Sequence, residues 1–441
     1  MVFLLKKDGG MRLFAVLLSL LFAYFVYSFP VGTTTIDVPV ARANLTGNVN
    51  AQITISNLLG GTNVTNVTFF FANNTGVRQI IGSNTSQNLT VYTINWATTT
   101  AGTGEGINFT FFANVTYYNM TGPDVNVSTA SVGNITIDNT RPLIAPNAPV
   151  NNTNTSSAVV AFNFTVIATV DTVFDCNLTL DPVNSTFGAI INTSTTVLNG
   201  TATTFVNTIQ EGRHTWNVRC LDTVSLSNQT NNFTFSVATT VPTVTLNFPP
   251  NLSILNNTGF AFNFTPISIV FSLFTDCNLT INPTNTTGGG IINSSSNVVN
   301  GSVISYQTTP ADGDRTWNVQ CRDPADNVAF STNNTFTFDS SAPVINMSFI
   351  DPLNSLPSTS FGLGSEVLAK CARGDSITGV NHTEILLKAP YDQSFISKKV
   401  DNTLVPASSS TASTEYTITG EDTNELGTYT VECRAVDKAG I

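Results

Sequence analysis

One strand-like stretch recurs along this chain and limits what it can fold into. Thr215–Asp222 reads TWNVRCLD, and Thr316–Asp323 reads TWNVQCRD about 100 residues later, a spacing typical of tandem modules. A looser copy occupies Thr428–Arg434. Read with a period of two, the aromatic residue, the valine and the cysteine share one face, which predicts a half-buried β-strand. The repeat therefore predicts a string of β modules.

Two of these modules are duplicates. Ala161–Thr165 and Ala261–Thr265 are identical, and Asn199-Gly200 has its counterpart in Asn300-Gly301. Short alternating strands separated by Gly, Pro and Asn turns, with no helical period after the N-terminal segment, predict an all-β fold of tandem β-sandwiches. The expected segments are 1–28, a signal peptide or membrane anchor; 31–140, a module without cysteine; 141–240; 241–341, the duplicate of the preceding module; and 342–441.

The last segment differs from the others at its end. After Val436–Ile441 no counterpart of the final strand of the earlier modules follows. The chain is therefore interpreted as a fragment of a longer protein. The alternative is that a partner donates the missing strand.

The N-terminus and the composition predict export. Lys6, Lys7 and Arg12 precede the apolar run Leu13–Tyr27, and cleavage is expected after Ser28. The alternative is an uncleaved anchor, because the run is at the short end for a membrane span. Charged residues make up 10% of the chain, and the net charge of -11 offers no basic surface for nucleic acid. A membrane contact is expected only through this segment or through a C-terminal anchor beyond the sequence.

The cysteines predict disulfides. In an exported chain, six cysteines indicate three bridges. Two fall in each of the last three modules, which favours pairing within modules, whereas zinc is disfavoured because no short C-x₂₋₄-C spacing occurs. The expected pairs are Cys176 with Cys220, Cys277 with Cys321, and Cys371 with Cys433.

These strands resemble the immunoglobulin-like modules of large prokaryotic, particularly archaeal, cell-surface proteins. In that family a late strand of the form aromatic-x-V-x-C/A-x-x-D precedes a turn, a last strand and a proline that opens the next module. Asn95–Thr100 is similar to the family's W-D-T-T turn, although Ala97 replaces the Asp. The resemblance implies the fold and little about activity.

The cysteines also depart from antibody-type domains, in which a bridge joins the second and sixth strands. Cys176 and Cys277 each follow an earlier full strand, so bridges from the third to the sixth strand are predicted there. Cys371 is expected on the second strand, which gives the ordinary pairing. Trp216, Trp317 and Tyr429 are expected in the cores.

N-x-S/T sequons are the most frequent motif, with about 30 in the chain. In a strand the Asn and the Ser/Thr share the outer face and the middle residue points inward. An Asn- and Thr-rich strand produces sequons by accident, and amide ladders are a minor alternative. Asn is however a poor strand former, so N-glycosylation is the preferred interpretation. The expected sites are Asn66, Asn108, Asn114, Asn134, Asn163, Asn177, Asn232, Asn263 and Asn278.

Other motifs are weaker. Arg373-Gly374-Asp375 is the tripeptide that animal adhesion receptors bind, and it is expected in a loop as an ordinary solvated turn. Asp323 and Asp326, with Asn327, are weak calcium candidates in a turn, and Asp437 is a similar case.

No catalytic constellation is evident, and no cofactor or enzymatic activity is expected. The two histidines, His214 and His382, lie in a turn and in a sequon, and no nucleophile elbow or phosphate loop occurs.

The sequence thus predicts an exported, heavily N-glycosylated structural protein of the cell surface, such as a stalk, coat or surface-layer component. The alternative is an adhesin or glycan-binding protein whose contact surface lies in the fourth module or beyond Ile441, since that module is charged and has few sequons. An enzyme on a stalk would need a further domain. The expected partners are the cell envelope or other surface proteins, with glycans as a further option.

Overall fold

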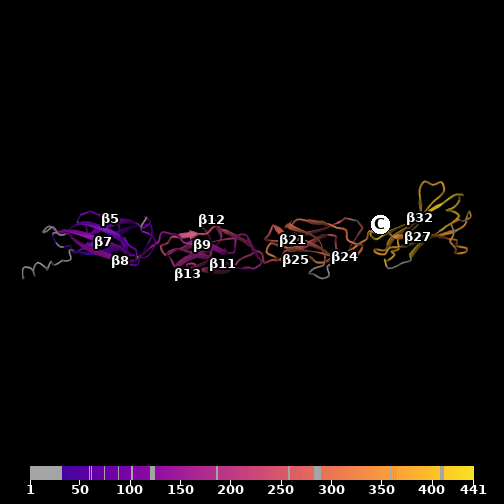
Figure 1. Cartoon of the computed structure of the whole chain (residues 1–441). Coiled ribbons are helices and arrows are strands. Elements are labelled where there is room, and N and C mark those ends of the chain that lie inside the picture. Colours follow the sequence, from indigo (N-terminus) through magenta and orange to yellow (C-terminus); the bar gives the residue numbers. More distant parts are fainter. Residues whose placement is uncertain are drawn as a thin grey trace, which may run out of the picture. The chain divides into compact units, whose positions relative to one another are not determined.

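The computed structural model describes residues 32–441, apart from 59, 61, 74, 88, 101–102, 120–124, 185–186, 257–258, 283–289, 358, 361, 363 and 408–411. Within the described residues the regular secondary structure consists of β-strands without α-helices, so the all-β prediction is confirmed (Figure 1). Accordingly, no helix of sufficient length and apolarity to span a membrane occurs in this part of the chain. The expected signal or anchor, 1–28, lies outside the described residues.

The chain divides into two compact units. One comprises 1–151, 161–207 and 215–234, and the other comprises 152–160, 208–214 and 235–441. The first unit holds a complete β-sandwich and most of a second, and the other unit holds two more. The module limits expected from the sequence stay predictions.

The first sandwich has two sheets whose strands come from alternating parts of the chain. Its strands are β1 (Thr33–Val38), β2 (Asn44–Leu45), β3 (Asn48–Ser56), β4 (Thr62–Ala72), β5 (Arg78–Asn84), β6 (Val91–Ala97), β7 (Gly106–Asn119) and β8 (Val125–Ile137). The sheets have the orders β1-β3-β6 and β2-β8-β7-β4-β5. The first, second and fifth full strands face the others, which is the immunoglobulin-like arrangement.

The second sandwich repeats this layout. Its strands are β9 (Leu143–Ala148), β10 (Thr153–Thr155), β11 (Val159–Ile167), β12 (Val173–Asn184), β13 (Phe187–Leu198), β14 (Ala202–Thr208), β15 (Gly212–Leu221), β16 (Ser227–Gln229) and β17 (Phe233–Val237). The sheets are β14-β11-β9 and β10-β17-β15-β12-β13, with β16 added to β15.

The third sandwich matches the second strand for strand. Its strands are β18 (Thr243–Phe248), β19 (Ser253–Leu255), β20 (Ala261–Ile267), β21 (Leu273–Ile281), β22 (Ile291–Val299), β23 (Ile304–Gln307), β24 (Gly313–Arg322), β25 (Val328–Phe330) and β26 (Asn334–Phe338). The sheets are β18-β20-β23 and β19-β26-β24-β21-β22, with β25 added to β24. The duplication visible in the sequence is therefore also a duplication of the fold.

The fourth sandwich is smaller. Its strands are β27 (Val344–Ile350), β28 (Val367–Gly374), β29 (Val380–Lys388), β30 (Ile396–Asp401), β31 (Ala412–Ile418) and β32 (Thr430–Asp437). They form the sheets β27-β28-β31 and β30-β29-β32. Where β24 pairs with β26 in the third sandwich, β32 pairs with β29 alone among the described strands.

The inward faces of the strands pack as aromatic cores. Trp216 and Trp317 are fully buried, as predicted, and each meets a phenylalanine edge-on, Phe162 at 5.4 Å and Phe262 at 5.1 Å between ring centroids. Such edge-to-face pairs are a preferred aromatic geometry. Tyr429 is only partly buried and packs at the margin of the fourth core. It therefore differs from the two tryptophans.

The three disulfides join the expected pairs, Cys176–Cys220, Cys277–Cys321 and Cys371–Cys433. The first two link directly opposed residues of neighbouring strands, β12 with β15 and β21 with β24, which are the third and sixth full strands. The last bridge joins β28 to β32 and so connects the two sheets of the fourth sandwich. No cysteine in the described residues is free, which leaves no thiol for zinc.

Candidate metal centres

Three equivalent positions follow the last strand of the first three sandwiches. Asp138, Ala238 and Asp339 each donate their backbone N–H over 2.9 Å to a short strand of the same sandwich, to Leu45, Thr155 and Leu255 respectively. The identical hydrogen bond shows that these three residues occupy the same place in the fold. Two of the three are aspartates, and both are buried.

The turn after the second full strand supplies another set of equivalent positions. In the second sandwich, Asn199 Nδ2 donates to the carbonyls of Ala168 and Asp171 at 2.7 and 2.8 Å. In the third, Asn300 Nδ2 donates in the same way to Ser268 and Phe271 at 2.8 and 2.9 Å. Asp171 and Phe271 are therefore counterparts.

In the fourth sandwich the turn after β28 carries Asp375. One carboxylate oxygen of Asp375 accepts the N–H groups of Ile377, Thr378 and Gly379 at 2.7–2.9 Å. Asp375 is thereby fixed in a turn after the second full strand, as Asp171 is.

The loop after the sixth full strand supplies the remaining set, Asp222, Asp323 and Asp437. In each case the backbone N–H of the aspartate bonds to the carbonyl of the residue four positions later, and that residue's N–H bonds back to the aspartate Oδ1. These two bonds hold the carboxylate rigidly in all three loops. We name the three combinations the first junction (138, 171, 222), the second junction (238, 271, 323) and the third junction (339, 375, 437).

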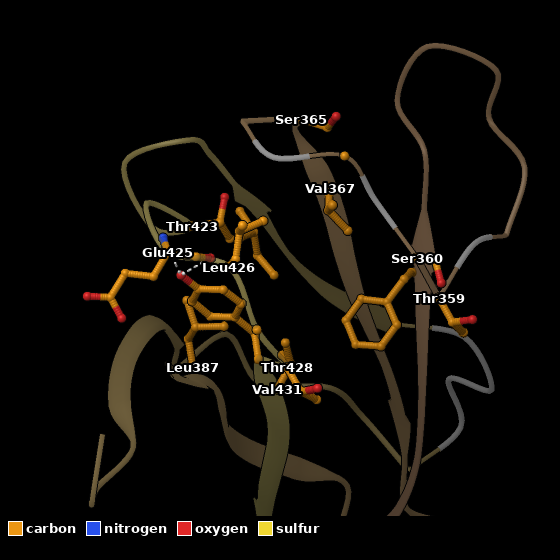
Figure 2. A pocket seen from close by; sticks show the side chains of 15 residues that line it. Thr359, Ser360, Ser365, Val367, Leu387, Thr423, Glu425, Leu426, Thr428 and Val431 are labelled. Atoms are coloured by element: carbon orange, nitrogen blue, oxygen red, sulfur yellow. Dashed lines mark hydrogen bonds between the residues drawn. The ribbon is translucent and has the colours of Figure 1, made fainter. Parts of the chain in front are cut away.

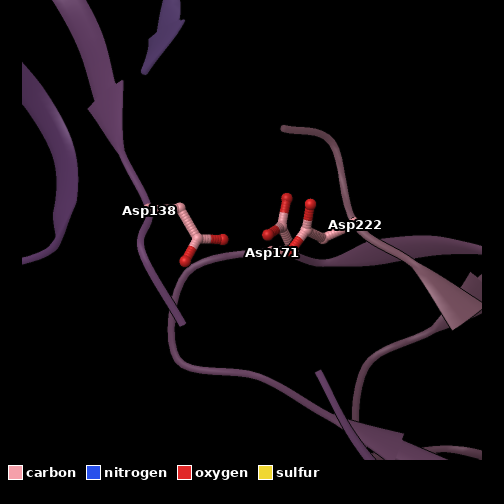
Figure 3. A group of neighbouring side chains, drawn as sticks. All are labelled: Asp138, Asp171 and Asp222. Carbon is pink, nitrogen blue, oxygen red and sulfur yellow. The ribbon is translucent and has the colours of Figure 1, made fainter. Parts of the chain in front are cut away.

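At the first junction three buried carboxylates converge. One oxygen from each of Asp138, Asp171 and Asp222 lies within 4.8 Å of the others, and the side chains face one another (Figure 3). The residues are 1%, 4% and 8% exposed. In each carboxylate one oxygen accepts a hydrogen bond, from Thr140 N, the Thr223 hydroxyl or Leu226 N. The other oxygen, Oδ2, is buried without any hydrogen-bond partner in all three.

This crowding changes the acidity of the group. Burial, together with the neighbouring Asp171 carboxylate, raises the pKa of Asp138 to about 7. Burial likewise raises the pKa of Asp222, opposed by the N–H of Leu226 and reinforced by the charge of Asp171. Both effects disfavour the charged form of an unpaired carboxylate. Because unpaired buried charges are costly, carboxylates in such a place either bind a proton or are paired with a cation.

The third junction has a similar cluster. Oxygens of Asp339, Asp375 and Asp437 lie within 4.8 Å of one another, and all three residues are buried. Here Asp339 Oδ2 accepts the Thr378 hydroxyl at 2.7 Å. Asp437 Oδ2 remains buried without a partner. The third junction thus offers the same residue types with fewer unsatisfied oxygens.

The second junction has the same frame without the cluster. Ala238 and Phe271 replace two of the aspartates, and Asp323 is fully satisfied. Its Oδ1 accepts the N–H groups of Ala325 and Asn327 at 2.9 and 3.0 Å, and its Oδ2 accepts Asn327 Nδ2 at 3.0 Å. At the position of Asn327 the other two loops carry Leu226 and Ile441, which have no side-chain donor.

A second acidic contact holds the residues that directly follow positions 138, 238 and 339, at the end of each of the first three sandwiches. Glu105 accepts the N–H of Asn139 at 2.9 Å and the hydroxyl of Thr140 at 2.8 Å. Glu211 accepts the N–H and hydroxyl of Thr240 at 2.9 and 2.6 Å, and Asp312 accepts those of Ser340 at 3.0 and 2.8 Å. This linker clamp is present in all three places, whereas the acidic cluster is present in two.

The calcium candidates chosen from the sequence, Asp323 and Asp326, lie in the loop of the second junction, outside the two acidic clusters. Asp323 spends both oxygens on hydrogen bonds within its own loop, and the side chain of Asp326 is 85% exposed, 3.8 Å from Arg322. Neither belongs to a carboxylate cluster in the described residues. Asp437, the similar case, does belong to one. The sequence signal that was missed is the aspartate directly after the last strand of a sandwich, present at 138 and 339.

The structure corrects the interpretation of the Arg373-Gly374-Asp375 tripeptide as a solvated turn. Strand β28 runs through Gly374, so its inward alternation places Arg373 in the core side of the sheet, 4% exposed. Arg373 forms an ion pair with Asp401 at 2.9 Å and a hydrogen bond with Thr414. Asp375 belongs to the third junction. A receptor cannot reach either side chain in this fold.

The sequon strands have the expected alternation. The nine expected asparagines are exposed or half-buried, and eight of the nine middle residues are buried. The structure supplies another reason for two of them, because Asn108 and Asn134 have φ values of 64° and 58° at irregularities of the β7–β8 pairing. Asn adopts that left-handed conformation more readily than most residues. Glycan attachment at the nine sites stays a prediction.

The two histidines lie in different sandwiches. The His214 ring lies 2.9 Å from the carbonyl of Gln210, and the His382 ring lies 2.7 Å from Asn402. The structure does not bring them together into one site.

The fourth sandwich contains a cavity of about 420 Å³. Its apolar lining includes Phe349, Val367, Leu387, Ile418 and Tyr429. Figure 2 shows Thr423, Glu425 and Leu426 on one side of the opening and Thr359 and Ser360 on the other. The size is within the range of small-ligand sites.

No family model and no curated protein matches the chain. Among solved structures, the tetra-tandem repeat in the extending region of a large adhesion protein is similar over 93% of this chain and 96% of that one, at 15% identity and a TM-score of 0.31. The fibronectin(III)-like modules of CbhA from Clostridium thermocellum are similar over 44% of this chain and 93% of theirs, at 16% identity and a TM-score of 0.26. The FN1–FN3 domains of chicken CNTN1 are similar over 69% and 97%, at 9% identity and a TM-score of 0.25. The functional argument therefore rests on the residues of this chain.

Proposed function

We propose that this chain is an exported structural spacer of a cell surface, N-glycosylated along the outer faces of its strands. The observation that carries the proposal is the set of three disulfides in a chain that begins with a signal-like segment. Disulfides persist in oxidising compartments outside the cytosol. A spacer also needs no catalytic cleft, and the proposal includes no enzymatic activity within these residues.

The outer faces favour a glycan coat. Sequons place their asparagines on the solvent side of strands whose few charges would not otherwise protect them. Bulky glycans there would block edge-to-edge pairing between copies of uncharged strands. The proposed partners are other components of the cell envelope.

The proposal is tested by the mass of the protein secreted from its native cells. Deglycosylation is expected to lower the intact mass by the mass of several glycans. Alkylation without prior reduction is expected to label no cysteine. A mass equal to that of the bare polypeptide would contradict the glycan coat. Six labelled thiols would contradict export to an oxidising compartment.

The sequons at Asn199 and Asn300 serve as internal controls for site mapping. Both N–H groups of each side-chain amide are already donated to backbone carbonyls, so glycan attachment would break the turn. These two asparagines are expected to be unmodified while Asn108 and Asn232, both exposed, carry glycans. Glycans on Asn199 and Asn300 would contradict the fold as well as the proposal.

The cavity of the fourth sandwich favours a second candidate, a glycan-binding adhesin. The test is a glycan array probed with the whole chain and with Leu426→Arg, which adds a charge at the exposed rim. Leu353→Arg, on an exposed residue outside the cavity, is the matched control. Binding that only Leu426→Arg abolishes would support the adhesin, and no binding to any glycan would leave the spacer.

A further inference from the structure

We propose that the first junction binds a Ca²⁺ ion through Asp138, Asp171 and Asp222, and that the third junction binds a second through Asp339, Asp375 and Asp437. The second junction binds none. This goes beyond the spacer role, because a spacer could be built without any ion.

The geometry matches one ion per cluster. Calcium–oxygen distances are about 2.3–2.6 Å, so two oxygens on the same ion lie at most about 5 Å apart. The candidate oxygens of each cluster lie within 4.8 Å of one another. Three carboxylates can provide up to six oxygens, because an oxygen that accepts a hydrogen bond still has a second lone pair. Further ligands can come from water or from backbone carbonyls.

The unsatisfied oxygens point to a ligand rather than to a hydrogen-bond network. Asp138 Oδ2, Asp171 Oδ2 and Asp222 Oδ2 are buried and have no donor. The three carboxylate groups to which they belong face one another (Figure 3). A buried polar atom without a partner costs free energy, more so if it is charged. A divalent cation would satisfy all three at once.

The second junction provides the internal comparison. Where two of the three aspartates are absent, the loop carries Asn327, whose amide satisfies the remaining Asp323. Where the three aspartates are present, that position is Leu226 or Ile441, which donates its backbone N–H to the aspartate but has no side-chain donor. The side-chain amide donor is thus lacking at the two junctions where a cation would bind.

Calcium fits better than other metals. The ligands are all carboxylate oxygens, which hard cations prefer over the nitrogen and sulfur that zinc takes. Magnesium demands octahedral geometry and keeps several of its waters, which suits a deeply buried triad less well. The first junction is expected to bind more tightly, because it has three unsatisfied oxygens and the third junction has one.

The ligands come from two successive sandwiches at each site. Asp138 follows the last strand of the first sandwich, whereas Asp171 and Asp222 belong to loops of the second. The same is true of Asp339 with Asp375 and Asp437. A bound ion would therefore restrain the linker as well as the loops.

The experiment is equilibrium dialysis of the whole chain, freed of metal by chelation, against Ca²⁺ up to about 10 mM, since extracellular modules bind with dissociation constants of about 10⁻⁴–10⁻³ M. Two ions per chain are expected. Asp171→Asn and Asp138→Asn, which alter the same site from different sandwiches, are each expected to lose one ion, and Asp437→Asn is expected to lose the other. Asp326→Asn, on an exposed aspartate three residues after Asp323, is expected to keep both.

Circular dichroism and the absence of free thiols show that each variant is folded. The absence of bound Ca²⁺ at 10 mM, or a stoichiometry that Asp171→Asn and Asp138→Asn both leave at two, would overturn the first site. Two ions in Asp437→Asn would overturn the second. These results do not depend on glycans or secretion, so a failure here is distinguishable from a failure of the spacer proposal.

Discussion

The first and second junctions share the same backbone and hydrogen-bond frame but differ in the number of carboxylates that it surrounds. In both, the residue after the last strand of a sandwich, Asp138 or Ala238, donates its backbone N–H to a short strand. Both also have a turn held by an asparagine side chain and a linker held by a glutamate. At the first junction this frame surrounds three carboxylates, and at the second it surrounds Ala238, Phe271 and one satisfied Asp323. The frame is therefore sufficient for a structural turn, and the aspartates are an addition to it.

This difference identifies which residues serve folding and which serve a ligand. If the aspartates were needed for the turn, their replacement in the duplicated sandwich would have altered the hydrogen bonds of the frame. Those bonds instead differ by about 0.1 Å between the two copies, 2.7 and 2.8 Å against 2.8 and 2.9 Å for the asparagine amides. The carboxylates are thus free to have another role.

Exchanging the residues of the two junctions is expected to have the largest effect. Ala238→Asp, Phe271→Asp and Asn327→Leu together rebuild the first junction at the second, and are expected to raise the Ca²⁺ stoichiometry from two to three. Asp138→Ala with Asp171→Phe does the opposite and is expected to lower it to one. In each case the affected site changes from binding at millimolar Ca²⁺ or below to no measurable binding, or the reverse. Equilibrium dialysis measures both.

If each exchanged variant still bound two ions per chain, the aspartates would not determine Ca²⁺ binding, and the proposed difference between the two junctions would be wrong. Asn327→Leu alone is the control. It removes the donor to Asp323 without adding ligands, so the stoichiometry is expected to remain two.

Much of the fold could be predicted from the sequence because its signals are local. The alternation in Thr215–Asp222 determines which residues face inward, so the burial of Trp216 and the position of Cys220 follow from a period of two. The placement of Cys176 needed only the observation that a full strand precedes it. Such inferences use spacing along a single strand or the count of strands before it.

The acidic clusters could not be predicted in this way. Asp138, Asp171 and Asp222 come from three segments and two sandwiches, and their meeting depends on how the turns fold back in space. The sequence-based choice of Asp323 and Asp326 relied on acidic residues close in sequence, which are those that a loop satisfies by itself. The tripeptide at Arg373 was placed in a loop for a related reason, since β28 continues three residues beyond Cys371, to Gly374.

The turn asparagines test whether the two frames are equivalent. Asn199→Ala and Asn300→Ala each remove two half-buried hydrogen bonds donated by the side-chain amide and one accepted by its oxygen. Each is expected to destabilise its sandwich by about 2–3 kcal/mol. Thermal unfolding in EDTA measures this. Only Asn199→Ala is expected to weaken Ca²⁺ binding, by about tenfold, because Asn199 positions the turn that carries Asp171.

Equal Ca²⁺ affinity in wild type and Asn199→Ala would show that the turn does not position the ligand. A much smaller destabilisation at one asparagine than at the other would show that the duplicated frames are not energetically equivalent.

Neutralising one aspartate at each junction is expected to have opposite effects in the absence of metal. Asp171→Asn removes one of three repelling carboxylates and places an amide donor beside the unsatisfied oxygens, so it is expected to stabilise the metal-free protein by about 1 kcal/mol. Asp323→Asn sets an amide against the Asn327 amide and is expected to destabilise it by about 1–2 kcal/mol. Urea unfolding in EDTA measures both. The same sign for the two variants would mean that the first junction is not strained by its charges.

The linker clamp is expected to give the smallest effect, and one that depends on pH. Hydrogen bonds from Thr240, set against a smaller opposing effect of burial, lower the pKa of Glu211. A carboxyl with a lowered pKa in the folded state stabilises the fold above its unfolded pKa of about 4.3, and this contribution is lost as the pH falls through the folded pKa. Glu211→Gln is therefore expected to lower the unfolding temperature by about 2–4 °C at pH 7, and by progressively less as the pH falls through the folded pKa of Glu211.

The direction of this pH dependence distinguishes the clamp from the clusters. The clamp is a hydrogen-bonded carboxylate at the surface, so its contribution is below about 1 kcal/mol and should be insensitive to Ca²⁺. Asp392→Asn, on an exposed aspartate of the fourth sandwich, is the control and is expected to leave the unfolding temperature unchanged. If Glu211→Gln lowered the unfolding temperature equally at pH 3 and pH 7, the charge of Glu211 would not hold the linker. The clamp would then depend on the shape of the side chain alone, and the frame shared by the three junctions would be a matter of packing.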